Sequence, residues 1–436
     1  MNILVLTDFF FPDSMGGANK MAFCTSRGLA GRGHKVFIVV RRARPELADQ
    51  ETIEGIEVYR YDLPKKTFAS FNVSARPQIR NILRNIEGSG HVPLDIVILH
   101  QPLAAAEAVT HAFVRDAPWL YNFHSPWGEE FLINRPVHWC GKWNLALLIR
   151  KRMRDWLEGR VLRRCQRIIL LSEFMRRRLE RVHGLAARSV IIPGGVDTEV
   201  FSPPGDQGRL RRELGLPPDK VVLFTVRNLR KRMGLPNLVR AMAELKSVGD
   251  RIHLVLAGKG ELEGSLKGMA EGLGVADRIT LTGHVPEQEL PRFYQAADFF
   301  VLPTEYLEGF GMVTLEALAT GAPVIATPVG ATPEILSLIG DEWLCRDASI
   351  SALAGKIEEM VIWRLENPDE YSKTRKRCRD CAVTRYAWPL IIDQWEAHCK
   401  EVIRAWKEQR HAPPSPASTS SPGWTKGARP KTPSSP

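Results

Sequence analysis

Two glutamates, Glu308 and Glu316, stand eight positions apart and bracket a glycine–aromatic–glycine turn, Gly309-Phe310-Gly311. A buried strand is predicted over residues 298–303 before the turn, and helix formers fill residues 312–320 after it. Such a turn presents free backbone N–H groups and the positive end of a helix dipole, and both suit a phosphate. The turn is therefore a candidate phosphate site.

The two carboxylates could hold hydroxyl groups on either side of that phosphate, because an ionised carboxylate accepts hydrogen bonds. A nucleotide-sugar has hydroxyls on both sides of its pyrophosphate. Glu308, before the turn, would then face the sugar, and Glu316, one to two helical turns later, would face the ribose. The alternative is an ordinary strand-to-helix loop with two solvated acids, since glycines are common at such junctions.

Two further candidates follow predicted strands, where the loops of a parallel sheet reach a ligand. Gly16 and Gly17 open a predicted helix and allow close backbone approach, although a tight structural turn explains the pair equally well. His124 follows the strand predicted over residues 119–123. Its side chain could donate a hydrogen bond to a sugar hydroxyl or stabilise charge near the anomeric carbon. The alternative is that it is a loop histidine hydrogen-bonded to the backbone.

Four cations in six residues follow the predicted strand 220–225, and they are Arg227, Arg230, Lys231 and Arg232. They could neutralise a pyrophosphate leaving group, a task that many transferases give to a divalent metal. No two aspartates stand two positions apart, so the sequence favours a metal-free mechanism and no cofactor. Gly258 can give close backbone approach, but its surroundings resemble a dinucleotide fingerprint only loosely, which disfavours a nicotinamide enzyme.

Strands that alternate with helices must position these residues, and this alternation predicts parallel sheets covered by helices. The predicted strands cover residues 3–7, 35–40, 95–100, 119–123, 167–171, 190–193, 220–225, 253–257, 279–282, 298–302 and 323–326. A stretch dense in Pro and Gly, residues 192–205, separates two such series and is typical of an interdomain hinge. We therefore expect an α/β protein with two Rossmann-like domains that face each other across a cleft.

The expected division is an N-terminal acceptor-side domain over residues 1–195 and a nucleotide-sugar-binding domain over residues 196–385. An amphipathic helix over 386–410 would cross back to the first domain, and a Pro/Ser-rich tail over 411–436 is expected to be disordered. The N-terminus resembles a first strand and not a signal peptide. Seven scattered cysteines indicate a reducing cytoplasm and not a disulfide framework.

The net charge of +11 is unevenly placed, with fourteen Lys/Arg and four Asp/Glu between Lys142 and Arg188. The signatures of common nucleic-acid modules are missing, so a membrane surface or a phosphorylated acceptor fits better. Residues 143–164 have apolar side chains at helical spacing, and one face of the helix carries Leu145, Leu148, Arg152, Trp156 and Arg160. This pattern indicates either an interfacial helix that holds a lipid-linked acceptor or a core-packed helix with a solvated basic face.

The sequence resembles the family-4 retaining glycosyltransferases, whose GT-B architecture has two facing Rossmann-like domains. The resemblance covers about residues 1–405 and is most specific at Glu308 to Glu316, which matches the family's E-x7-E motif. Six further landmarks occur in the expected order, namely residues 16–17, 123–127, 172–174, 192–197, 283–286 and the flanks of the motif at 302–305 and 316–324.

The resemblance implies a retaining enzyme that transfers a sugar from a UDP- or GDP-sugar to a glycan or lipid-linked acceptor, usually without a required metal. The acceptor pathway would be cell-surface polysaccharide or glycolipid synthesis, with peripheral contact to the inner membrane surface. The implied donor contacts are Glu308 to the sugar, Glu316 to the ribose, Val285 to the base, His124 at the reaction centre, Gly16 and Gly17 to the diphosphate, and the backbone of Gly309, Phe310, Gly311, Met312 and Val313 to sugar hydroxyls and phosphates.

One departure from the family pattern concerns the phosphate clamp. The family has Gly-Arg-Leu and then a basic residue directly before a glycine, but Asn228 and Met233 occupy the two cationic positions here. Arg227 and Arg232 stand one residue earlier with the same mutual spacing, so we expect them to form the clamp, with Lys231 in reserve. The alternatives are an inactive, transferase-like binding or scaffold protein and a nucleotide-sugar epimerase, although the second glutamate is hard to explain in an epimerase.

Overall fold

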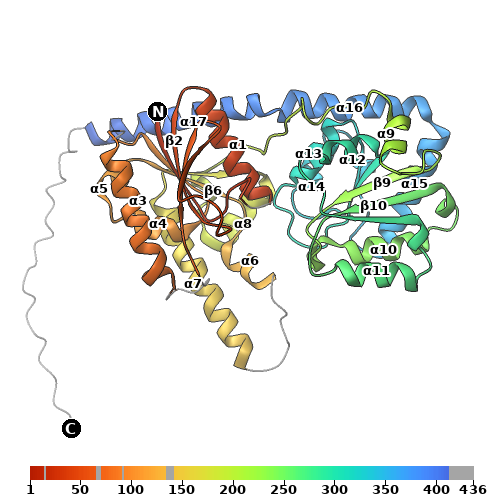
Figure 1. The fold of residues 1–436 in the computed structure, drawn as a ribbon, viewed down its shortest axis with the longest axis horizontal. Helices are drawn as coiled ribbons and strands as arrows, with labels where there is room; N and C mark the ends of the chain where they lie inside the picture. Colours follow the sequence, from red (N-terminus) through yellow and green to blue (C-terminus); the bar gives the residue numbers. More distant parts are fainter. Residues whose placement is uncertain (14–15, 65–69, 91–92, 134–141, 412–436) are drawn as a thin grey trace, which may run out of the picture.

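A computed structural model describes residues 1–13, 16–64, 70–90, 93–133 and 142–411. Two halves, each built around a sheet, lie side by side, and the helices α16 (Pro368–Tyr386) and α17 (Trp388–His411) extend along both (Figure 1). The expected disordered tail falls almost wholly on residues 412–436, which lie outside the described residues.

The first sheet has eight strands in the order β3-β4-β2-β1-β5-β6-β7-β8. Every neighbouring pair is parallel except β3 and β4, which form an antiparallel hairpin at one edge. The strands are β1 (Asn2–Thr7), β2 (Lys35–Arg41), β3 (Gln50–Ile53), β4 (Ile56–Tyr61), β5 (Ile96–Leu99), β6 (Trp119–Phe123), β7 (Arg167–Leu170) and β8 (Ser189–Ile191).

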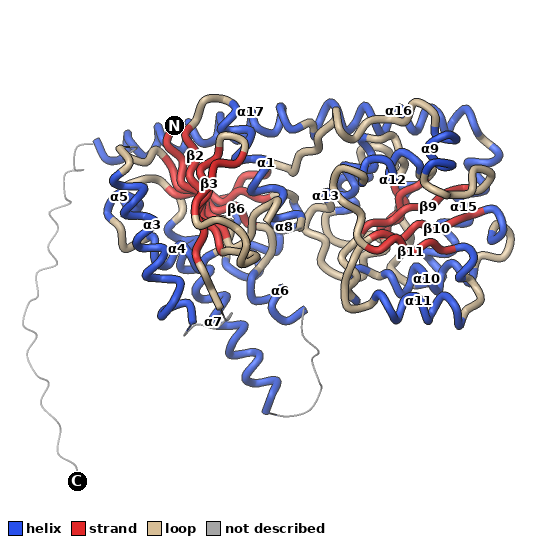
Figure 2. The backbone as a smooth tube through the Cα atoms, viewed as in Figure 1, coloured by secondary structure: helices blue, strands red, loops and turns tan. Residues whose placement is uncertain are grey.

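Helices cover both faces of this sheet (Figure 2). They are α1 (Gly17–Gly31), α3 (Arg76–Gly88), α4 (Pro102–Ala108), α5 (Ala112–Arg115), α6 (Trp127–Ile133), α7 (Lys142–Arg164) and α8 (Glu173–His183), with shorter turns η1 (Phe71–Ala75) and η2 (Ala186–Arg188). α8 shows clear local signals, because the Ser172 hydroxyl accepts from the Met175 N–H at 3.2 Å and Gly184 ends the helix with φ 66°.

The second sheet has five parallel strands in the order β11-β10-β9-β12-β13. The strands are β9 (Val221–Val226), β10 (Ile252–Ala257), β11 (Ile279–Gly283), β12 (Phe299–Leu302) and β13 (Val324–Ala326). The helices around it are α9 (Gln207–Glu213), α10 (Leu235–Glu244), α11 (Glu263–Gly272), α12 (Leu290–Ala296), α13 (Met312–Ala319), α14 (Thr332–Leu336) and α15 (Ile350–Glu366), with the 3-10 turns η3 (Lys231–Met233), η4 (Gly249–Arg251), η5 (Ala276–Arg278) and η6 (Asp341–Trp343).

The chain passes between the halves twice, and the two passages are hydrogen-bonded to each other. The Val196 N–H donates to the Tyr386 carbonyl at 2.7 Å, and the Trp388 N–H donates to the Val196 carbonyl at 3.2 Å. Gly195 packs so closely on the Trp388 ring that a β-carbon there would require the ring to move. The glycines of the predicted hinge therefore serve close packing at the crossing point.

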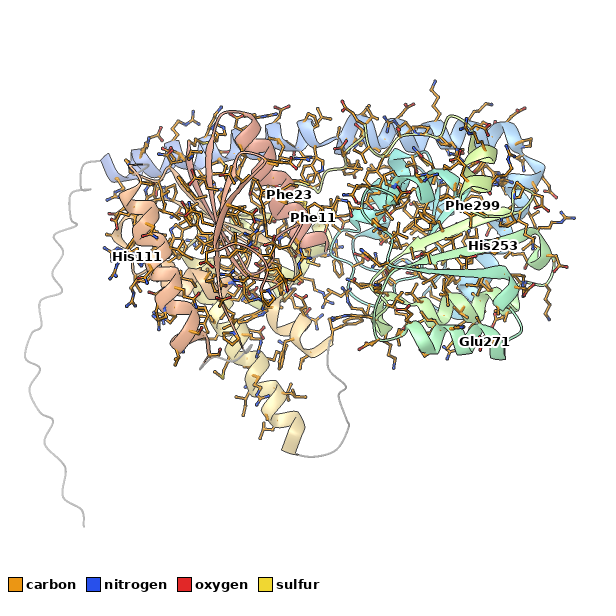
Figure 3. The ribbon with its side chains drawn as sticks, in the orientation of Figure 1. Phe11, Phe23, His111, His253, Glu271 and Phe299 are labelled. Carbon is orange, nitrogen blue, oxygen red and sulfur yellow. The ribbon has the colours of Figure 1, made fainter. Side chains whose placement is uncertain are left out.

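The core follows the alternation of the strands. In β1, Ile3 and Val5 join one hydrophobic cluster, and Leu4 and Leu6 join a second cluster on the opposite face of the sheet. The first cluster continues through α1 and α17 into the second half, where Phe299 of β12 is buried (Figure 3). This continuity fixes the two sheets relative to one another.

All predicted strands occur within two residues of their expected bounds. The hairpin of β3 and β4 was missed. Its turn places Glu54 at φ 46° and Gly55 at φ 80°, and it joins β3, whose residues alternate between exposed and partly buried, to β4, which is almost wholly buried. The predicted parallel sheets are confirmed, with this one antiparallel hairpin added at an edge, because a short hairpin can close an edge without a crossover helix.

Candidate active site

The turn between β12 and α13 brings both motif glutamates into buried positions. Glu308 is 9% exposed and Glu316 is 4% exposed. Gly311 starts α13 with φ 86°, a conformation that favours glycine. Gly330 lies directly against the Glu308 carbonyl, where a β-carbon would overlap it, and the Ala331 N–H donates to the same oxygen at 3.0 Å. The backbone at Glu308 is therefore held from two sides.

The Glu308 carboxylate is paired with a buried arginine. Arg227 Nη2 contacts Glu308 Oε2 and also donates to Thr304 Oγ1 at 3.2 Å. The Thr304 hydroxyl lies 3.3 Å from the same carboxylate oxygen and donates to it. The Arg227 and Glu308 side chains are 6% and 12% exposed, so this ion pair lies where solvent screens it weakly.

Arg227 also meets Met233, which occupies one of the family's two cationic positions. Met233 Sδ lies 2.9 Å from Arg227 Nη2, and the Met233 side chain is buried. The Arg227 Nε is buried without a hydrogen-bond partner. Asn228, at the other cationic position, is exposed. The Arg227 guanidinium therefore lies beside the end of the Met233 side chain, and its role in a phosphate clamp stays a prediction.

The two other predicted clamp cations lie differently. Arg232 is partly buried and donates through Nη1 to the Leu307 carbonyl at 2.8 Å, next to the glutamate turn. Burial lowers the pKa of Arg232, and the nearby Glu308 carboxylate raises it in part. The Lys231 side chain is exposed. Arg227 and Arg232 therefore lie at the motif, whereas Lys231 faces solvent.

Glu316 is held by residues from both halves. Tyr294 of α12 donates to Glu316 Oε2 at 2.9 Å, and Lys20 of α1 donates to Glu316 Oε1 at 2.7 Å. Lys20 also pairs with Glu287. Burial lowers the pKa of Lys20, but the two carboxylates outweigh that effect and raise it above its ordinary value. This cation links the first half to the predicted ribose site.

His124 lies directly after β6 and is stacked on a second histidine. His124 Nε2 and His100 Nδ1 share a hydrogen bond of 2.9 Å, and the rings stack with centroids 5.2 Å apart. Burial lowers the pKa of His124 to about 4, and burial together with its neighbour lowers the pKa of His100 well below the ordinary value. Both rings are therefore neutral at neutral pH, and His124 can act there only as an uncharged donor or acceptor.

The first strand-to-helix turn is anchored by the edge hairpin. Arg60 of β4 makes a bidentate pair with Asp13, at 2.6 and 2.9 Å, and both side chains are buried. On the same turn, the Phe11 ring packs on the ring of Phe23 in α1, with the ring centroids 5.3 Å apart (Figure 3). A β-carbon on Gly17 would lie 3.7 Å from Met312. The Gly16-Gly17 turn therefore touches the start of α13.

The rest of the glutamate turn also touches the first half. A β-carbon on Gly309 would lie 3.0 Å from the His124 carbonyl oxygen, and the Ser172 hydroxyl donates to the Gly309 carbonyl at 2.9 Å. Gly194 leaves room for both Phe310 and Met312. His124, the two-glycine turn and the glutamate turn thus come together between the halves.

Three predicted contact residues have other surroundings. Gly258 has φ 134° and packs directly against the Arg227 carbonyl, so it makes room for the backbone that carries the arginine. Val285 is buried just after β11, and Val313 is partly buried in the first turn of α13. In the described residues, no group of three or more His, Cys, Asp or Glu side chains is arranged to hold a metal ion.

Sequence reasoning missed the partners of the predicted residues. Lys20, His100 and Tyr294 hold Glu316 or His124, and Ser172 and Thr304 hold the turn around Glu308. Lys20 stands in the turn of α1 that follows Gly16-Gly17, which is the one signal that could have identified it. Thr304 stands four residues before Glu308, and it and Ser172 lie in segments that resemble the family, but nothing local predicts their contacts. The contacts of His100 with His124 and of Tyr294 with Glu316 join residues more than twenty positions apart.

Comparison with known proteins gives family matches over both halves. The family described as Glycosyltransferase Family 4 matches residues 15–200, and the family described as Glycosyl transferases group 1 matches residues 206–380. A sucrose-phosphate synthase from Thermosynechococcus elongatus has a similar fold, with a TM-score of 0.75 and 22% identity over 93% of this chain and 99% of that one. The fold is therefore GT-B, as predicted.

Three curated relatives are similar in sequence. A GDP-mannose-dependent alpha-(1-6)-phosphatidylinositol monomannoside mannosyltransferase from Mycolicibacterium smegmatis is 33% identical over 56% of this chain and 64% of its own length. Its counterpart from Mycobacterium tuberculosis matches over 53% of its length, so these matches span between half and two thirds of the relatives. A D-inositol 3-phosphate glycosyltransferase from Acidothermus cellulolyticus is 36% identical over 72% of this chain and 71% of its own length. The chain therefore belongs to glycosyltransferase family 4.

Proposed function

We propose that the protein is a retaining glycosyltransferase that moves a sugar from a UDP- or GDP-sugar to a glycan or lipid-linked acceptor. The observation that carries this proposal is the pair Glu308 and Glu316, which flanks a glycine turn in contact with the first half. Family membership supports the reaction class, and so do two of the curated relatives, one named as a GDP-mannose-dependent mannosyltransferase and one as a D-inositol 3-phosphate glycosyltransferase.

The donor would lie along the turn between β12 and α13. Glu316 would accept hydrogen bonds from the ribose hydroxyls, with Lys20 and Tyr294 fixing its two carboxylate oxygens. The backbone of residues 309–313 and the Gly16-Gly17 turn would hold the diphosphate. Glu308 would accept hydrogen bonds from the donor sugar. Val285 would lie beside the base.

Leaving-group departure would depend on the two arginines. The bond between the anomeric carbon and the diphosphate oxygen breaks, and negative charge builds on the diphosphate. Arg227 and Arg232 would stabilise that charge. The Nε–H of Arg227 is buried and has no hydrogen-bond partner, so it could donate to a phosphate oxygen. No metal or other cofactor is required in this scheme.

The acceptor hydroxyl forms the new bond to the anomeric carbon, and its proton passes to the departing diphosphate or to solvent. His124 would line this reaction centre as a neutral ring, because its pKa is lowered to about 4. We assign no nucleophile to the enzyme. Retention would follow from attack on the face that the diphosphate leaves, and this part of the proposal is tested separately below.

We also propose a cytoplasmic enzyme of cell-surface polysaccharide or glycolipid synthesis that contacts the inner membrane surface. The cysteines in the described ranges are free and buried, in keeping with a reducing compartment. None of the described helices is long and apolar enough to cross a membrane.

An inactive, transferase-like scaffold is the second candidate, and Asn228 and Met233 favour it because they remove the family's two cations. The contact between Arg227 and Met233 argues against it, since a cation is still delivered to the same place. A scaffold would have no reason to keep a buried arginine beside Glu308 at an energetic cost.

A thermal-shift screen against UDP- and GDP-sugars tests the proposal. We expect one nucleotide series to raise the melting temperature of the wild type, and Glu316→Ala to lose most of that shift. Glu263→Ala, a change in the first turn of α11 away from the motif, is the control and should retain it. If the folded wild type shows no change in melting temperature with any donor, the inactive scaffold becomes the better assignment for this protein.

A further inference from the structure

Helix α7 consists of two parts with different surroundings. Its C-terminal part packs into the first half, with Glu158, Val161 and Leu162 buried. Glu158 accepts hydrogen bonds there from Tyr121 and from the Trp127 N–H, at 3.3 and 3.1 Å. Its N-terminal part extends away from the sheet and beyond the neighbouring helices (Figure 1).

The extending part carries a stripe of exposed large apolar side chains, called here the α7 stripe. Its members are Leu145 (64% exposed), Leu148 (50%), Ile149 (51%), Met153 (59%) and Trp156 (62%). Their spacing of three, one, four and three residues puts all five on one side of a helix. The flank of the helix that carries Lys151 and Asp155 contacts α6, where both side chains lie against Gly128. The core-packed alternative is therefore wrong for this part of α7.

The charges around the α7 stripe are mostly positive. From Leu145 to Trp156 the helix has four cations and one acid, Asp155, which is paired with Lys151 at 2.6 Å, and Arg150 and Arg152 are exposed. Arg160 lies over the Trp156 ring at 5.5 Å, which extends the cationic border toward the body of the protein. The α7 stripe is therefore an apolar surface with exposed arginines on it and beside it, and the acid in its range, Asp155, is already paired.

We propose that the α7 stripe docks on the surface of an anionic lipid bilayer. A helix face that combines large apolar side chains, a tryptophan and exposed arginines suits the boundary between headgroups and acyl chains. A second copy of the chain fits less well, because two such helices would bring like charges together. α6 packs on α7 and begins three residues after His124, so docking would place the reaction centre near the membrane surface.

The test is co-sedimentation of the full chain with vesicles, without any donor, so that its outcome is independent of the proposed reaction. We expect binding to vesicles of phosphatidylglycerol and phosphatidylcholine, and much weaker binding to phosphatidylcholine alone. Ile149→Ser/Met153→Ser/Trp156→Ser should lower the binding constant by at least about tenfold, because the interfacial helix loses most of its apolar area. The matched control, Leu273→Ser/Leu338→Ser/Leu365→Ser, removes three exposed apolar side chains elsewhere and should bind like the wild type.

A second pair of variants tests the charges. Arg150→Gln/Arg152→Gln should weaken binding to anionic vesicles by about fivefold for each cation removed, whereas Arg212→Gln/Arg346→Gln should change it little. Circular dichroism melts show whether each variant is folded. Equal binding by the stripe variant and its control would overturn the proposal. So would absence of vesicle binding together with a dimer that the stripe variant abolishes, which would assign the surface to a second copy.

Discussion

Replacing Arg227 and then restoring a cation from position 233 probes how this chain handles the donor phosphates. The family pattern places a basic residue at position 233, where this chain has Met233. Because Met233 Sδ lies 2.9 Å from Arg227 Nη2, a lysine at position 233 would carry its charge to the place that the Arg227 guanidinium occupies. Arg227→Met therefore lacks this cation, and the double variant Arg227→Met/Met233→Lys restores one close to the position of the original guanidinium.

The expected effects follow from the burial of the pair. Arg227→Met removes a preorganised donor at a site of developing charge, a loss that typically lowers kcat by about 10²–10³. It also leaves Glu308, whose side chain is 12% exposed, without its cation, at about 3–5 kcal/mol of folding free energy. Met233→Lys in this background should recover at least about tenfold in kcat/KM, equivalent to roughly 1.4 kcal/mol.

The assay is release of nucleoside diphosphate from the donor found in the thermal-shift screen, measured well below the melting temperature of every variant. Arg211→Met is the matched control. Arg211 pairs with Asp298 at 2.7 Å, is 5% exposed and lies in the same half, remote from the glutamate turn. We expect Arg211→Met to lower the melting temperature in the same way while it leaves kcat/KM nearly unchanged.

Two results would refute this reasoning. One is an Arg227→Met variant whose kcat/KM stays within about threefold of the wild type, a difference of less than 1 kcal/mol. The other is a double variant that is folded and no more active than Arg227→Met alone. Either result would mean that Arg227 only balances the Glu308 charge and does not act on the donor.

Three further predictions concern pH, backbone packing and stereochemistry. The folded protein keeps His124 neutral down to a pKa of about 4, whereas the unfolded chain takes up the proton near pH 6.5, so the free energy of unfolding should fall by up to about 3 kcal/mol as pH drops from 6.5 to 4. Urea titrations should show a smaller fall in His124→Gln, and an unchanged slope would contradict the assignment. Gly330→Ala should displace the Glu308 backbone and lower both the melting temperature and kcat/KM. Gly264→Ala should change neither, because a β-carbon on Gly264 would meet no atom within 4 Å. Equal effects of the two substitutions would show that Gly330 does not hold the Glu308 backbone in place. Proton NMR of the first product should show the anomeric configuration of the donor, and an inverted product would rule out the retaining mechanism.

Local patterns sufficed for most of the fold. Buried runs such as residues 119–123 and 298–302 identified strands because a parallel strand covered on both faces has a nearly continuous apolar sequence. The hairpin of β3 and β4 was missed because β3 is partly solvated and the turn residue Glu54 is an unusual choice at positive φ. That hairpin matters for the site, since Arg60 in β4 holds Asp13 in the first strand-to-helix turn.

The site could be predicted only in part. The motif glutamates and the glycine turns are local in the sequence, and the structure brings them together with His124. Lys20 and Glu316 are 296 residues apart, and no local pattern pairs them. The same holds for Arg227 and Glu308. The sequence shows an arginine one residue before the family's cationic position, but not that its guanidinium contacts the Glu308 carboxylate. Helix α7 shows the same limit, since periodicity identifies an apolar face but not what covers it.

The central claim is that Glu308 belongs to a site that cleaves a nucleotide-sugar, and its most direct test is turnover of the donor. Purified wild type should release nucleoside diphosphate from one UDP- or GDP-sugar, faster with a lipid or glycan acceptor and slowly by hydrolysis without one. Glu308→Gln should bind that donor with a similar thermal shift and release the diphosphate at least about 10²-fold more slowly, the size of effect seen when one polar contact to a transition state is lost. Equal release by wild type and Glu308→Gln, or no release from any donor that the folded wild type binds, would contradict the account.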